Sequence, residues 1–142
     1  MDSSSLSSIL DNSLVASLIK EAKAAKLYAY VPYSRFPVGA SVISSSYRIY
    51  SGCNVENSSF GLTICAERTA IVKAISEGDL EFLAVMVVTD KDNYIWPCGA
   101  CRQFLSEFGN IPIISMKNDG SLQMHMLSHL LPFHFSKNDF VQ

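Results

Sequence analysis

Hydrophobic residues along this chain follow two alternating spacings, one typical of helices and one typical of strands. Three segments place them on one helical face: 13–29, 65–77 and 98–108. Four segments have a strand pattern: 38–44, 48–55, 82–89 and 111–116. The third of these is almost continuously apolar, which is typical of a strand buried on both faces. Further on, 122–126 predicts a short strand and 127–131 a helical turn before a proline.

The order of these elements predicts an α/β fold. Helices that alternate with buried strands indicate a sheet that is covered by helices on both faces. The length of 142 residues corresponds to one domain. Residues 1–10 are rich in serine, so we expect a disordered tail there and a single catalytic domain over residues 11–142.

Composition narrows the classes of partner. The net charge is −2, and the 11 basic residues are scattered among 13 acidic ones rather than clustered, which argues against a nucleic-acid partner. Charged residues are only 17% of the chain, against about 25% in an average domain, and this excess of apolar surface favours a homo-oligomer. The longest apolar run, 82–88, is too short to span a membrane, and no signal peptide is recognised, so we expect a cytoplasmic protein.

Three of the four cysteines have the spacing of a metal site. Cys98 and Cys101 lie three residues apart at a predicted helix start, where free backbone N–H groups and the helix dipole stabilise thiolates. Cys65 begins the preceding helix. If both helices follow parallel strands, the three sulfurs converge at one edge of the sheet. Three protein ligands around Zn²⁺ leave one position open for water, which is the catalytic pattern.

A carboxylate stands beside this predicted centre. Glu67 is two residues beyond Cys65, close enough to reach a water on the metal without being a ligand. Zinc lowers the pKa of such a water towards 7, and the carboxylate can pass its proton to a substrate nitrogen. The cysteines alone also fit a thioredoxin-like redox pair, or a closed, non-catalytic zinc site with Cys53 as the fourth ligand. The combination of C-A-E with a later P-C-x-x-C is a closely similar signature to that of zinc deaminases.

At these residues the sequence resembles the small homotetrameric cytidine deaminases. The likeness runs from about Tyr30 to Phe135. Its strongest pieces are PYSRFPVGA at 32–40, NVEN at 54–57, CAER at 65–68, PCGACRQF at 97–104 and LLP at 130–132. The resemblance implies a three-layer αβα sandwich around a five-stranded mixed sheet, with one Zn²⁺ per subunit on the three cysteines and Glu67 as the proton shuttle.

The same resemblance assigns the substrate contacts. Phe36 would pack against a pyrimidine ring, and Asn54 and Glu56 would hold the ribose hydroxyls. Arg68 matches the position thought to offset the negative charge of three thiolates around zinc. The backbone N–H of Ala66, near a helix start, is expected to hold the O2 atom of the ring.

Other positions are implied to complete a neighbour's site in a homotetramer, namely Phe60 and Phe135. Here the chain departs from the family pattern, since many members have tyrosine at the first position and Phe-Gly-Pro at the second. Trp96 stands where a small Ser or Thr is usual, and Gly61 where some members have proline. Three histidines near the C-terminus (His125, His129 and His134) are not expected to form a second metal site.

The function implied is hydrolytic deamination of free cytidine and 2′-deoxycytidine to uridine and 2′-deoxyuridine in pyrimidine salvage. Ammonia is released, zinc-bound hydroxide attacks the ring, and Glu67 shuttles protons. A deaminase of polynucleotides would need a basic groove, and one of deoxycytidylate a cationic phosphate site. A deaminase of a nucleoside-like antibiotic shares the zinc motif and remains an alternative.

Overall fold

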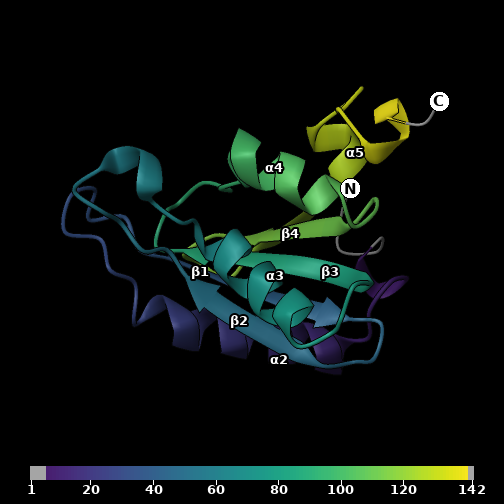
Figure 1. The fold of residues 1–142 in the computed structure, drawn as a ribbon. Helices are drawn as coiled ribbons and strands as arrows, with labels where there is room; N and C mark the ends of the chain where they lie inside the picture. Colours follow the sequence, from purple (N-terminus) through teal and green to yellow (C-terminus); the bar gives the residue numbers. More distant parts are fainter. Residues whose placement is uncertain (1–5, 141–142) are drawn as a thin grey trace.

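The computed structural model describes residues 6–140, and its centre is a five-stranded mixed sheet (Figure 1). The strand order is β2-β1-β3-β4-β5. The strands are β1 (Val38–Ser44), β2 (Ile49–Cys53), β3 (Phe82–Thr89), β4 (Pro112–Met116) and β5 (Leu122–Met126). β1 runs antiparallel to β2 and β3, β4 is parallel to β3, and β5 is antiparallel to β4. Consequently β2, β3 and β4 all point the same way.

Helices cover both faces of the sheet, which confirms the predicted three-layer αβα sandwich. α2 (Asn12–Lys26) packs on one face, whereas α3 (Ala66–Ser76), α4 (Gly99–Ser106) and α5 (Leu127–Leu130) pack on the other (Figure 1). Each face of the sheet has its own hydrophobic core, and successive residues of a strand point to opposite faces. In β3, Met86 packs in the core on the α2 side and Val87 in the core on the α3 side. Two 3₁₀ turns, Phe60–Leu62 and Lys137–Phe140, complete the described elements.

The predicted element bounds are right within a few residues. The largest difference is at the end of α2, which ends at Lys26 rather than at residue 29. The backbone of Tyr30 is instead held extended, because its N–H donates to the carbonyl of Asn54 and its own carbonyl accepts from the N–H of Glu56. The same contacts draw residues 54–55 away from β2, which therefore ends at Cys53.

Packing begins earlier in the chain than the predicted domain boundary at residue 11. Leu6 and Leu10 are 7% and 3% exposed and belong to the α2-side core. Both therefore pack in the domain, although the sequence assigns them to the serine-rich tail. Residues 1–5 of that predicted tail lie outside the described residues.

A glycine in β2 allows α3 to lie unusually close to the sheet. A Cβ atom at Gly52 would lie 2.7 Å from the backbone N of Ala70 and 2.7 Å from side-chain atoms of Thr69. No side chain larger than hydrogen fits there without moving the helix. Gly52 thus sets the position of α3, and with it the position of the residues at the start of that helix.

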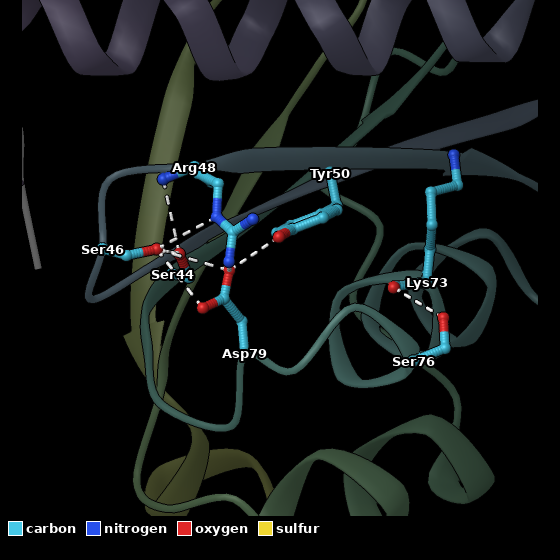
Figure 2. A network of polar contacts seen from close by, with 7 residues as sticks. All are labelled: Ser44, Ser46, Arg48, Tyr50, Lys73, Ser76 and Asp79. Atoms are coloured by element: carbon cyan, nitrogen blue, oxygen red, sulfur yellow. Dashed lines mark hydrogen bonds and ion pairs between the residues drawn. The ribbon is translucent and has the colours of Figure 1, made fainter.

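The other end of α3 is fixed by a polar network at the β1–β2 turn (Figure 2). The carboxylate of Asp79 accepts a hydrogen bond from the Tyr50 hydroxyl at 2.6 Å and pairs with the Arg48 guanidinium at 3.2 Å. Ser46 also donates to this carboxylate. The hydrogen bond from Tyr50 holds the pKa of Asp79 below its ordinary value. The network ties the chain leaving α3 to the strands beneath it.

Candidate active site

Three cysteines converge at the starts of two helices. Cys65 is the N-cap of α3 and Cys98 the N-cap of α4, while Cys101 lies in the first turn of α4. The Sγ atoms of Cys65 and Cys98 are 3.7 Å apart, and all three sulfurs lie within 4.8 Å of one another. The predicted convergence at one edge of the sheet is confirmed, since α3 and α4 follow strands that point the same way. Among residues 6–140, Cys53 is not part of this group.

This donor set fits a zinc ion. Three soft sulfur ligands at mutual contact distance leave room for a fourth ligand that is not protein, as in catalytic zinc sites. The Cys65 thiol is already poised to ionise, because a hydrogen bond from Cys101 and then the neighbouring Arg68 lower its pKa to about 5. The shared hydrogen bond has the opposite effect on Cys101, whose pKa is raised. Cys65, Cys98 and Cys101 thus form the zinc cluster.

Arg68 lies beside the sulfurs, one helical turn after Cys65. Its Nη2 donates to the Sγ of Cys65 at 3.6 Å and to the carbonyl of Thr63 at 3.3 Å. The contact with Cys65 raises the pKa of Arg68. The Nε–H of Arg68 is buried without a hydrogen-bond partner among the described residues, which is costly unless an anion forms nearby. A metal-bound thiolate cluster supplies that negative charge.

Glu67 is a buried carboxyl group at the start of α3. The residue is only 5% exposed, and burial raises its pKa to about 7. A carboxyl group with a pKa near neutrality can both accept and return a proton at physiological pH. Ala66, fully buried, is the first residue of the same helix, where backbone N–H groups lack partners in a preceding turn.

The residues predicted to hold a sugar are engaged with the backbone of residues 33–38. Asn54 donates through Nδ2 to the carbonyl of Phe36 at 2.8 Å and accepts at Oδ1 from the N–H of Val38 at 2.9 Å. Glu56 accepts from the N–H groups of Tyr33 and Ser34 at 3.0 and 3.1 Å. Hydrogen bonds from Ser34, above all from its side chain, lower the pKa of Glu56 and keep it ionised.

A cavity of about 270 Å³ lies over this segment. Its lining residues are Tyr33, Ser34, Glu56, Phe60 and Thr63. Phe60 is 72% exposed, and its ring meets that of Tyr33 in an edge-to-face arrangement, with ring centroids 5.4 Å apart. The cavity thus brings together one predicted sugar ligand and one predicted subunit-crossing residue.

Two other predicted positions, Phe36 and Phe135, do not line this cavity. Phe36 has its ring under the ammonium of Lys91, which lies 4.7 Å from the ring centroid. Phe135 is 59% exposed, and its carbonyl accepts a hydrogen bond from Gln103 of α4. In this single chain the backbone of Phe135 is therefore tied to α4, and its side chain is not packed in a core.

Trp96, the departure beside Pro97, packs against the edge strand. Its ring centroid is 4.7 Å from that of His125 in β5 and 6.4 Å from that of Tyr94. His125 in turn lies edge-on to His129, with centroids 5.4 Å apart. The group of three possible metal ligands found among residues 6–140 is Cys65, Cys98 and Cys101, and it does not include these histidines. Burial lowers the pKa of His125.

The sequence pattern assigns no role to Arg102, although it lies one turn after a metal ligand. Its side chain donates to two backbone carbonyls, those of Pro97 and Leu130, each at 2.7 Å. The one signal in the sequence is its place about one helical turn after Cys98, four residues on, as Arg68 lies three residues after Cys65. Spacing alone does not show which atoms an arginine reaches.

A three-cysteine zinc cluster beside a buried carboxyl group, on an αβα sandwich, defines a zinc-dependent enzyme of the deaminase type. The family model described as the cytidine and deoxycytidylate deaminase zinc-binding region matches residues 13–116, and the chain belongs to this family. No helix within residues 6–140 has the length and apolar character needed to cross a membrane.

Individual relatives agree with this assignment. The chain is 47% identical to the cytidine deaminase of Sporosarcina psychrophila over 127 residues, covering 88% of this chain and 93% of that one. It is 48% identical to a probable cytidine deaminase of Dictyostelium discoideum, with 87% and 84% covered. The crystal structure of cytidine deaminase from Burkholderia pseudomallei superimposes with a TM-score of 0.81 at 41% identity, covering 84% and 98%. That of Mycobacterium tuberculosis gives 0.74 at 38% identity, covering 89% and 98%.

Proposed function

We propose that this protein catalyses the hydrolytic deamination of free cytidine and 2′-deoxycytidine to uridine and 2′-deoxyuridine, with release of ammonia. The observation that carries the proposal is the buried Glu67 carboxyl group at the start of α3, next to three thiols within 4.8 Å of one another. The choice of substrate is supported by relatives named cytidine deaminase, which are 45–47% identical and are covered over more than nine-tenths of their length.

Glu67 carries out the proton transfers. When bound, zinc supplies a Lewis acid that makes water a nucleophile near neutral pH. Glu67 accepts a proton from the attacking water and delivers it to N3 of the ring while the oxygen bonds to C4. The second proton of the water passes by the same carboxylate to the amino group, and the C4–N bond breaks to release ammonia. The pKa of about 7 suits Glu67 both to accept a proton and to give it up near neutral pH.

Arg68 acts on the charge of the centre. Three thiolates around Zn²⁺ leave a net charge of about −1, which weakens the metal as a Lewis acid. The guanidinium of Arg68, 3.6 Å from the Cys65 sulfur, withdraws electron density from one of those ligands. The charge compensation inferred for Arg68 rests on this contact.

Ring and sugar contacts are proposed for one continuous segment. Phe36 packs against the pyrimidine, and the N–H of Ala66 holds its O2 atom. The amide of Asn54 has two N–H groups and two lone pairs on its oxygen, and the backbone of residues 36 and 38 uses one of each. The unused N–H and lone pair are available to a ribose hydroxyl, and Glu56 adds an ionised acceptor.

We also propose that the enzyme is a cytoplasmic homotetramer whose neighbouring subunits complete each site. Phe60 and Phe135 are 72% and 59% exposed, and large exposed rings of this kind mark interaction surfaces. Their positions match the family's subunit-crossing residues. A net charge of −2 without a basic cluster favours a free nucleoside over a polynucleotide, which fits pyrimidine salvage.

The test is a substrate panel on purified protein. Cytidine, deoxycytidine, CMP and single-stranded DNA are each supplied at equal concentration, and ammonia release is measured together with zinc per chain. We expect turnover of the two nucleosides alone. Turnover of CMP or DNA but not of nucleosides would overturn the substrate assignment, and bound zinc without any turnover would indicate a non-catalytic zinc module.

A further inference from the structure

Two arginines follow the two N-cap cysteines but make different contacts. Arg68, three residues after Cys65, reaches the sulfur itself. Arg102, four residues after Cys98, directs both of its described side-chain hydrogen bonds to carbonyl oxygens. The first arginine therefore acts on ligand charge, whereas the second acts on backbone geometry.

Arg102 holds the peptide groups on both sides of the Cys98 Cα atom. Its Nε donates to the carbonyl of Pro97 at 2.7 Å, and its backbone N–H donates to the carbonyl of Cys98 at 3.0 Å. Two fixed peptide planes determine the direction of the Cα–Cβ bond between them. The contacts of Arg102 therefore set where the sulfur of Cys98 points.

Cys98 is the zinc ligand most in need of such support. Cys101 is fully buried and Cys65 is half-buried, whereas Cys98 is exposed. An exposed side chain is not held in place by packing around it, so the direction in which the Cys98 sulfur points depends on the backbone of that residue. Residues that orient metal ligands in this way raise the affinity of the site for the metal.

The other end of the Arg102 side chain contacts a helix that is itself fixed to the sheet. Nη1 of Arg102 donates to the carbonyl of Leu130 at 2.7 Å, in α5. α5 is fixed to the sheet through Leu127, which is 2% exposed and whose N–H donates to the carbonyl of Ile111 at 3.0 Å. The planar guanidinium spans from α5 to the Pro97 carbonyl, and the single ammonium group of a lysine does not reproduce such a fork.

We propose that Arg102 is a positioning residue of the zinc centre. It holds the sulfur of Cys98 in position to bind the metal together with Cys65 and Cys101, because its side chain links the Pro97 carbonyl to α5 by hydrogen bonds. The proposal rests on the zinc site of the proposed function but not on its substrate. Its test is therefore made on metal binding, and a failure of cytidine turnover would leave it standing.

The chain provides a matched control. Gln103, the next residue of α4, also ties the helix to the C-terminal segment, through a 2.8 Å hydrogen bond from Nε2 to the carbonyl of Phe135. It makes no described contact with the Pro97–Cys98 peptide. Gln103→Ala therefore removes a tie of the same kind without releasing Cys98.

Zinc affinity is measured by competition with a chromophoric chelator for wild type, Arg102→Ala, Arg102→Lys and Gln103→Ala. We expect Arg102→Ala to bind zinc about 10–100-fold more weakly, Arg102→Lys to lie between it and wild type, and Gln103→Ala to match wild type. Cobalt-substituted Arg102→Ala should also show altered d–d absorption bands, because one thiolate is displaced.

Wild-type zinc affinity and cobalt bands in both arginine variants would overturn the proposal. Equal loss of affinity in Arg102→Ala and Gln103→Ala would overturn it as well, because the effect would then come from loosening the C-terminal segment. If Arg102→Ala does not fold, Arg102→Lys carries the comparison with Gln103→Ala.

Discussion

Replacing Glu67 by glutamine should separate stability from catalysis. In the metal-free protein, burial raises the pKa of Glu67 from 4.5 to about 7. The unfolded chain therefore releases this proton more readily than the folded one, so ionisation destabilises the fold as pH rises from about 4.5 to about 7. The difference of about 2.5 units between the two pKa values corresponds to a destabilisation of the folded state by about 3 kcal/mol at pH 8. This penalty nearly vanishes at pH 4, where the carboxyl group is protonated in both states. Glutamine carries no charge and avoids it.

The assay is urea unfolding of zinc-free protein at pH 8 and pH 4, at one fixed chain concentration. Glu67→Gln should be more stable than wild type at pH 8 by up to about 3 kcal/mol and nearly equal at pH 4. With zinc restored, its turnover of cytidine should fall by at least about 100-fold while zinc content stays at one per chain. Glu107→Gln, at an exposed position of the surface, is the control and should change neither quantity. The reasoning is refuted if the gain is absent at pH 8 or is the same at both pH values.

Three further predictions concern the frame of the site. Gly52→Ala should cost about 1–3 kcal/mol of stability by urea unfolding, because its Cβ meets the backbone of α3, and unchanged stability would contradict the close approach. Burial lowers the pKa of His125, so wild type should lose stability relative to His125→Asn in urea unfolding as pH drops below about 6.5, and a difference that does not change with pH would rule out this histidine. The fluorescence of the single tryptophan, Trp96, should change at the lower pH at which His125 of the folded protein gains its proton, and should not change in His125→Asn. Co-expressed Phe135→Ala and Glu67→Gln chains should recover activity that neither has alone, whereas no recovery would argue against shared sites.

Most of the fold and the metal cluster follow from local signals in the sequence. Apolar periodicity predicts β1, β3 and β5 at their observed bounds and α3 within one residue at each end. The convergence of Cys65 on Cys98 follows from two helix starts after parallel strands, which is a rule of topology. These features depend on the spacing of residue types over short stretches of chain, and so the sequence alone is enough to predict them.

The remaining features depend on contacts between distant segments. α2 stops at Lys26 because the backbone of Tyr30 pairs with residues 54–56, which no local pattern indicates. The serine-rich neighbours of Leu6 predict a tail, yet Leu6 packs in the core. The double backbone contact of Asn54 and the carbonyl contacts of Arg102 are likewise matters of tertiary geometry. In each case the residue type is informative, but it does not identify the partner.

The most direct test of the account is a zinc titration of the metal-free protein, with ammonia release from cytidine followed at each step. If Cys65, Cys98 and Cys101 form one catalytic zinc centre per chain, activity should rise from zero in proportion to added zinc and reach a plateau at one zinc per chain. Full activity in the chelated protein, or a filled zinc site that releases no ammonia from cytidine, would contradict the account.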